Sequence, residues 1–416
     1  MSDTAVSSRP RTLRGWLPAP TSIWVPLGIY LLSRAISALF LVVGAERQDA
    51  LTFTTPIKVT HPLPSRPSLL EVATNWDGQW YWAVVDHGYP SALPPSGSTI
   101  LQSPIAFYPG YPTVVEGVMR VTGVGFALAA VLVSLVAGGI AVVLLHRLLL
   151  RAVSPFVATA NITLLCVWPA AAVLGVAYTE GLALLLIVLA IRWLASRRYL
   201  LACAAALGLG LVRPLPLPLA VVVIAHAVAR WRDPADTLIL RDRVGLVAAL
   251  AGCALGTLAW PALAGLHTSD PLAYAHAMES WAPPGSRWGG WFSLLAAEGQ
   301  WALLGLVVLV VLGLLRALRS RPHGRTWPLE VRVWSGAYVL FVLATTLPTI
   351  GIARYALLAL VPFWPFPDDS GPERTSERRA RWAAFAVLVA LALAGQYWWV
   401  SNVFTIDGSP LEQSYP

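Results

Sequence analysis

Asp77 is the residue whose surroundings point most directly to chemistry. It lies in the stretch ATNWDGQWYWAVVDHGYP, between Trp76 and Trp80 and directly before Gly78. A carboxylate among large aromatic rings is partly removed from water, and in that setting it can act as a general base. Tryptophan rings also suit the C–H faces of sugars. The structural alternative is that Asp77 caps a helix over GQWYWAVV, because Asp is a favoured N-cap residue.

The same stretch ends in DHGYP, which holds Asp86, His87 and Tyr89. If residues 78–85 form a short helix, His87 could return near its start and lie close to Asp77. A lone histidine is also common as a hydrogen-bonded structural residue, whereas a functional histidine can titrate near neutral pH. Asp86 is expected to be a solvated loop acid.

Three further charged residues lie where apolar runs begin or end. Glu180, in AYTEGLALLL, is costly at a hydrocarbon boundary and is a functional candidate, although an acid in a first turn also complements the helix dipole. Arg213 (GLVRPLP) and Arg354 (GIARYALL) carry guanidinium groups suited to bidentate phosphate binding. Their structural alternative is snorkelling toward lipid headgroups. Arg34 lies midway along an apolar run and must face a cavity or a partner.

The composition indicates an all-α, polytopic membrane protein. Of the 416 residues, 57% are hydrophobic and only 12% are charged, against about 25% charged in a soluble domain. The apolar runs, such as FALAAVLVSLVAGGIAVVLLH, are long enough to cross a bilayer as helices and lack the alternation of a membrane barrel. We expect about eleven helices in a single domain over residues 1–416. Their approximate ranges are 22–44, 123–146, 155–174, 179–195, 199–212, 214–229, 244–265, 299–318, 332–350, 352–366 and 382–402.

The arginines predict the orientation. Most of them fall in loops on the side of the N-terminus, so the positive-inside rule places that terminus in the cytoplasm. The protein is expected in the inner (plasma) membrane of the cell. Residues 45–122 then form a large first loop outside the cytoplasm, and residues 266–298 form a second. The Pro-broken segment 103–123 is expected to be a juxtamembrane helix of the first loop. We read the first apolar run as a retained helix rather than a cleaved signal peptide.

Several other classes of site and partner are not indicated. The sequence has no Walker loop, dinucleotide fingerprint, HExxH or CxxC motif. Cys166, Cys203 and Cys253 all fall inside expected helices, which predicts apolar core residues rather than disulfides or metal ligands. The histidines are scattered, so we expect neither a metal nor another cofactor. No basic stripe with interleaved aromatics indicates a nucleic-acid partner.

Three motifs in order resemble a known family. NWDGQWYWAVVDHGYP, then AFYPGYP at residues 106–112, then YTEGLALLL at residues 178–186 resemble the PIG-V type of mannosyltransferase, in the GT-C superfamily of membrane glycosyltransferases. RPLPLPL, ARYALLALVPF and DPLAYAHAMESW are similar to later segments of that family, more loosely. Tyr108, where the family has Phe, and Gly181 after the glutamate are departures. The resemblance covers most of the chain and suggests a bacterial, actinobacterial member.

The resemblance implies a GT-C fold and a donor of the polyprenyl-phosphate-mannose type. Mannose would pass to a glycolipid or lipoglycan acceptor outside the cytoplasm, with inversion, and Asp77 would be the general base. Arg213 and Arg354 would hold the lipid phosphate. Further residues are implied to bind the sugar or acceptor or to shape the groove: Trp76, His87, Tyr89, Tyr108, Glu180, Trp281, Trp288 and Trp291.

Three alternatives remain open. The donor could carry another sugar, such as arabinofuranose or glucose. A lipid or sugar transporter would need ionisable pairs near the bilayer midplane and two related halves, whereas here the acids gather in the expected outer loops. A scaffold subunit of a glycolipid-synthesis complex would be inactive in isolation.

Overall fold

The fold is helical throughout the part of the chain that can be described. The computed structural model describes residues 21–53, 59–94, 102–281, 327–346, 350–360, 363–365 and 374–407. Within these ranges the strand-type pairing is limited to an isolated bridge between Leu51 and Leu63. The all-α class predicted from the apolar runs is confirmed.

The helices have the following bounds. The α-helices are α1 (Thr21–Ala45), α2 (Leu69–Val72), α3 (Asp77–His87), α4 (Gly110–Thr122), α5 (Phe126–Leu149), α6 (Pro155–Cys166), α7 (Glu180–Ala195), α8 (Tyr199–Val212), α9 (Pro216–Arg232), α10 (Leu240–Thr268), α11 (Ala273–Glu279), α14 (Leu329–Thr345), α15 (Ile352–Tyr355) and α16 (Thr375–Trp399). Short 3-10 segments are η1 (Pro104–Ala106), η2 (Ala171–Gly175) and η3 (Ala356–Ala359), and a π-helical turn, η4 (Val400–Phe404), extends α16.

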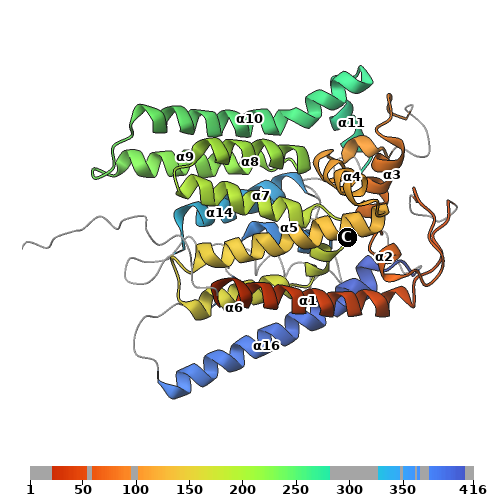
Figure 1. The fold of residues 1–416 in the computed structure, drawn as a ribbon, viewed down its shortest axis with the longest axis horizontal. Helices are drawn as coiled ribbons and strands as arrows, with labels where there is room; N and C mark the ends of the chain where they lie inside the picture. Colours follow the sequence, from red (N-terminus) through yellow and green to blue (C-terminus); the bar gives the residue numbers. More distant parts are fainter. Residues whose placement is uncertain are drawn as a thin grey trace, which may run out of the picture.

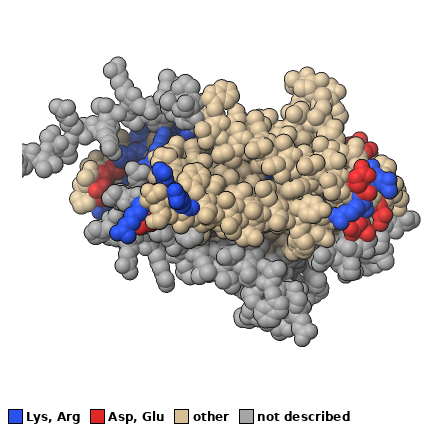
Figure 2. Space-filling view, turned by 90° about the horizontal axis from the view of Figure 1, so that it is seen from below, with Lys and Arg blue, Asp and Glu red and all other residues tan. Residues whose placement is uncertain are grey.

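The lateral surface of the bundle is that of a membrane protein. Among the described residues, α1, α5, α10 and α16 are long and apolar enough to cross a bilayer. Their outward side chains include Leu32, Val247 and Leu391, each more than half exposed. On the face seen in Figure 2, charged side chains lie at the two ends and uncharged ones between them. This banding is expected where hydrocarbon surrounds the middle of a bundle.

The two expected outer loops meet at one end of the bundle. Figure 1 shows α3 and α4, from residues 45–122, beside α11, from residues 266–298, with α2 at the same end of the bundle. Within residues 103–123, where a helix was expected, the structure has η1 followed by α4. The helix α10 reaches from the opposite end to α11 and packs against it. Two segments distant in sequence can therefore contribute to one site.

Small residues allow α8 and α10 to pack closely. A Cβ atom added at Gly210 would lie 2.2 Å from the carbonyl oxygen of Gly256, and one at Gly252 would lie 2.7 Å from Cys203 Sγ. Small residues at helix contacts are the usual way in which membrane helices approach each other. This contact fixes the end of α8, from which Arg213 emerges.

A polar network joins α8, α9, α10 and α14 at the end of the bundle away from α3. His226 Nδ1 lies 2.7 Å from Glu330 Oε1, which links α9 to α14. Arg230 Nη1 donates to the Tyr199 hydroxyl at 2.5 Å, and other guanidinium nitrogens of Arg230 bind Asp236 and Asp242. Buried charges need such partners. The network holds the first turn of α14, which contains Glu330.

The expected helix 155–174 is wrong in its second half, because α6 ends at Cys166. The chain then breaks before η2. Arg34 makes this break possible, since Arg34 Nη2 donates to the Cys166 carbonyl at 2.6 Å and Nη1 donates to the Ala171 carbonyl. Backbone inside a membrane must find such partners wherever a helix is interrupted. Arg34, predicted to face a cavity or a partner, therefore has a structural partner.

The expected helix 352–366 is also wrong, because the described residues of that range form only the short α15 and η3. Leu360 follows with φ +51°, which ends the helical course. Side chains of α14 satisfy the freed carbonyls: Trp334 Nε1 donates to Leu358 at 2.7 Å, and Ser335 Oγ donates to Leu360 at 3.2 Å. Of the other expected helices, 299–318 lies outside the described residues, and the rest agree within a few residues at most ends, α10 and α16 being longer.

Candidate active site

Asp77 begins α3 and is placed there by contacts with the C-terminal segment. Trp76, the residue before it, has φ +56°, an uncommon conformation for a bulky side chain. Trp76 Nε1 donates to the Phe404 carbonyl at 2.9 Å, and Asn75 Nδ2 donates to the same carbonyl at 3.2 Å. These bonds hold the backbone that leads into the helix. A residue kept in an uncommon conformation by its surroundings is a reason to look for function beside it.

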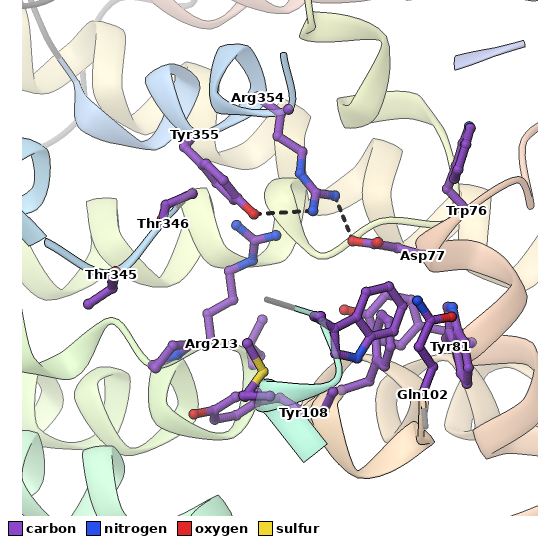
Figure 3. Close-up of a pocket in the computed structure, with 18 of the residues that line it drawn as sticks. Trp76, Asp77, Tyr81, Gln102, Tyr108, Arg213, Thr345, Thr346, Arg354 and Tyr355 are labelled. Carbon is purple, nitrogen blue, oxygen red and sulfur yellow. Dashed lines mark hydrogen bonds and ion pairs between the residues drawn. The ribbon is translucent and has the colours of Figure 1, made fainter. Parts of the chain in front are cut away.

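The side chain of Asp77 forms an ion pair instead of capping α3. The N-cap residue of α3 is Trp76, and no side-chain cap bond is formed. Asp77 Oδ2 accepts from Arg354 Nη1 at 2.6 Å (Figure 3). The N-cap alternative for Asp77 is therefore not what the structure contains.

Arg213 is held by the start of α7. Its backbone is extended, with φ −157° and ψ 158°, as expected for a residue that precedes proline. Its Nε donates to Thr179 Oγ1 at 2.7 Å and its Nη2 donates to Glu180 Oε1 at 2.8 Å. This arrangement places the guanidinium beside that of Arg354 (Figure 3).

Arg354 lies between two aromatic rings. Its guanidinium carbon is 5.2 Å from the ring centre of Tyr178 and 5.1 Å from that of Tyr355. The Tyr355 ring also lies 5.4 Å from the guanidinium carbon of Arg213. Arg354 Nε is 3.7 Å from Glu180 Oε1. The buried Glu180 carboxylate and the Tyr355 ring thus hold the guanidiniums of Arg213 and Arg354 side by side. Without these two groups, the repulsion between the guanidiniums would separate them.

These side chains open on a pocket of about 700 Å³. Asp77, Arg213 and Arg354 line it, together with Gln79, Gln102, Glu279, Thr345 and Thr346. The aromatic residues of its wall are Trp76, Trp80, Tyr81, Phe107, Tyr108, Tyr274, Trp281, Tyr338, Phe341 and Tyr355. Such a cavity, mostly apolar with a few convergent charged groups, has the character of a ligand site.

The aromatic wall brings both expected outer loops together. Trp80 and Phe107 stack with centres 5.4 Å apart, and Trp281 meets both edge-on at 5.4 and 5.6 Å. Burial raises the pKa of Tyr108 and of Tyr81, in Tyr81 with a further contribution from the charge of Asp77. Both phenols therefore remain protonated near neutral pH.

The structure brings six of the expected site residues to this pocket: Trp76, Asp77, Tyr108, Arg213, Trp281 and Arg354. Glu180 is fully buried behind the two arginines and is absent from the described lining. His87 does not return to Asp77: its side chain is 74% exposed at the far end of α3, beside Asp86. Tyr89 packs on Trp260 and donates to the Phe107 carbonyl at 2.9 Å. Trp288 and Trp291 lie outside the described residues.

Sequence reasoning missed Tyr355 and Tyr178. Each lies close to a residue that the sequence singles out: Tyr355 directly follows Arg354, and Tyr178 lies two positions before Glu180. Aromatic rings next to arginines at a membrane boundary were the available signal, but interfacial aromatics are common in any membrane protein. Within the described ranges, no three His, Cys, Asp or Glu side chains gather in a way that could hold a metal ion.

The helix arrangement is similar to that of the oligosaccharyltransferase of Archaeoglobus fulgidus. The structure of that enzyme tethered to an acceptor peptide matches with a TM-score of 0.45 and 13% sequence identity, over 93% of this chain and 56% of that one. The structure of its complex with an inhibitory peptide and a dolichol-phosphate matches with a TM-score of 0.46 and 13% identity, over 92% of this chain and 56% of that one. This chain thus spans little more than half the length of those structures. No protein-family model and no curated protein matches it. A likeness at this distance assigns no activity.

Proposed function

We propose that this protein is a membrane glycosyltransferase of the GT-C type that transfers mannose from polyprenyl-phosphate mannose to a glycolipid or glycan acceptor. The observation that carries the proposal is the convergence of the Asp77 carboxylate with the guanidiniums of Arg213 and Arg354 on a single pocket walled by aromatic rings. Mannose as the sugar rests on the resemblance of the three sequence motifs to the PIG-V family.

The charged groups match the needs of a glycosyl transfer from a lipid phosphate. Asp77 takes the proton of the acceptor hydroxyl, whose oxygen attacks C1 of the sugar. The bond between C1 and the phosphate oxygen breaks, and polyprenyl phosphate leaves with the bonding electrons. Attack opposite to the leaving group inverts the anomeric centre. Arg213 and Arg354 offset the charge that develops on the phosphate, a contribution that needs donors already fixed in place.

The remaining pocket walls suit the two substrates. Val212, Leu215, Phe341 and Val342 form an apolar part of the lining, which is compatible with an isoprenoid chain. Trp80, Phe107 and Trp281 offer aromatic surface for the sugar or the acceptor. With the N-terminus in the cytoplasm, this end of the bundle faces outward, and the donor, the acceptor and the membrane lipids are the expected partners.

The test is transfer of radiolabelled mannose from polyprenyl-phosphate mannose to membrane glycolipids by the purified full-length protein. We expect Asp77→Asn to lower the rate by about 10²–10⁴-fold, the usual contribution of a general base. Asp86→Asn is the matched control, because Asp86 lies on the same helix with its side chain 60% exposed, and it should transfer as wild type does.

Each other result has a defined meaning. Equal transfer by wild type and Asp77→Asn would exclude Asp77 as the base. Transfer of arabinofuranose or glucose in place of mannose, from the corresponding polyprenyl phosphates, would keep the reaction and change the donor. If the isolated protein transfers none of these sugars, the result would contradict the proposed transferase and favour the scaffold or transporter alternatives.

A further inference from the structure

The base and the phosphate-binding group of the proposed reaction are bound to each other. Arg354 Nη1 donates to Asp77 Oδ2 at 2.6 Å, a short bond between a charged donor and a charged acceptor. The guanidinium lies against this carboxylate oxygen, so the oxygen faces Arg354 and not an acceptor hydroxyl in the pocket. The arrangement in Figure 3 is therefore poor for general-base catalysis at this oxygen.

The guanidinium is the fixed member of this pair. The rings of Tyr178 and Tyr355 flank it, Arg354 Nη2 donates to the Tyr355 hydroxyl at 3.3 Å, and the buried Glu180 lies behind it. The side chain of Arg354 is 9% exposed, and that of Asp77 is 19% exposed. Asp77 lines the pocket from the first turn of α3. Rotation of its short side chain can therefore break the pair without any movement of Arg354.

A phosphate is the ligand that would cause this rotation. Phosphate oxygens form the same charge-assisted bonds with a guanidinium as carboxylate oxygens do, so the two anions compete for Arg354. Arg213, beside Arg354, adds a second cation that attracts a phosphate but is already bonded to Thr179 and Glu180. A phosphate between the arginines would interact with both guanidiniums. Among the described residues, Asp77 forms an ion pair with Arg354, and Arg213 pairs with Glu180.

We propose that the donor phosphate displaces Asp77 from Arg354, so that the base is released only when the donor is bound. This inference rests on the proposed function and adds an order to it: donor first, then deprotonation of the acceptor. In the empty site Arg354 acts as a positioning residue that holds the carboxylate. In the loaded site it binds the phosphate, and Asp77 turns to the acceptor hydroxyl.

The experiment is a double-mutant cycle on binding rather than on transfer. A prenyl monophosphate is titrated into the purified full-length protein in lipid nanodiscs, for wild type, Asp77→Asn, Arg354→Gln and the double variant. Removing the competing carboxylate should tighten binding to wild-type Arg354 by roughly three- to hundredfold, the range of coupling between residues in contact. In the Arg354→Gln background the same change should have little effect. Asp86→Asn serves as the control for loss of an acid elsewhere on α3.

The outcomes separate this inference from the function beneath it. If wild type does not bind the prenyl phosphate, the proposed donor class is wrong. If wild type binds but Asp77→Asn binds equally or more weakly, the displacement is wrong while the donor class stands. Asp77→Asn could also tighten binding equally with Arg354 present and with Arg354→Gln. The Asp77 carboxylate would then act on the phosphate by its charge alone, and displacement of Asp77 from Arg354 would be excluded. Matching thermal unfolding midpoints show that the variants are folded.

Discussion

Glu180 Oε1 and Arg213 Nη2 form an ion pair of 2.8 Å that joins the start of α7 to the end of α8. The Glu180 side chain is fully buried, and its other oxygen, Oε2, has no hydrogen-bond partner among the described residues. The same carboxylate lies 3.7 Å from Arg354. We therefore expect Glu180 to position the two arginines rather than to bind the substrate directly, as the sequence resemblance implied.

Removing the Glu180 carboxylate should destabilise the protein. Glu180→Ala leaves two neighbouring guanidiniums without their shared counter-charge, and breaking one side of a buried pair costs about 3–5 kcal/mol. We expect a clearly lower thermal unfolding midpoint in detergent. Glu116→Ala is the matched control: Glu116 pairs with Arg120 at 2.5 Å, but both side chains are well exposed, and such pairs contribute at most about 1 kcal/mol. Equal midpoints for the two variants would contradict a structural role for Glu180.

The Tyr355 ring should matter for donor binding, and its hydroxyl should matter little. The ring lies 5.4 and 5.1 Å from the guanidinium carbons of Arg213 and Arg354, and cation–π contacts contribute about 0.5–2 kcal/mol. Tyr355→Leu removes the ring and should raise the KM for the lipid donor by roughly 2- to 30-fold. Tyr355→Phe keeps the ring, and its KM for the lipid donor should stay near that of wild type.

The measurement for Tyr355 is initial rate against donor concentration at saturating acceptor. A loss of kcat with unchanged KM in Tyr355→Leu would contradict the role given to the ring. Equal defects in the Phe and Leu variants would assign the effect to the hydroxyl, which accepts a 3.3 Å bond from Arg354 Nη2.

Gly210 should be intolerant of even a methyl group. Its added Cβ would meet the Gly256 carbonyl oxygen at 2.2 Å, and overpacking of this kind costs about 1–3 kcal/mol. Gly28→Ala is the control within α1, since nothing lies within 4 Å of the added atom, and Ala stabilises a helix by up to about 1 kcal/mol over Gly. Thermal unfolding should place Gly210→Ala below wild type and Gly28→Ala at or above it; the reverse order would show that α8 and α10 separate easily.

The sequence by itself determined the elements whose signals are local. The bounds of α8, Tyr199–Val212, agree with the expected 199–212, because an uninterrupted apolar run between arginines and Arg213-Pro214 leaves few other boundaries. The sequence singles out Asp77 because its aromatic neighbours lie beside it in the chain, and it singles out Arg213 and Arg354 because each interrupts an apolar run. The structure places all three at one pocket.

The tertiary structure decided which charges meet and how the broken apolar runs are satisfied. The runs 155–174 and 352–366 were expected to be continuous helices because they are apolar, although Pro169 in the first run and Pro362 and Pro365 in the second are local helix breakers. The breaks are accommodated in the bundle because Arg34 and Trp334, far away in sequence, satisfy carbonyls that the breaks free.

Asp77 and Arg354 form an ion pair although they are 277 positions apart in the sequence. A helical periodicity relates residues within one helix and cannot predict a contact over such a separation. A local sequence pattern can predict a helix because the backbone hydrogen bonds of a helix join residues close in sequence. The contacts of Asp77, Arg34 and Trp334 with distant residues form only after the helices have packed.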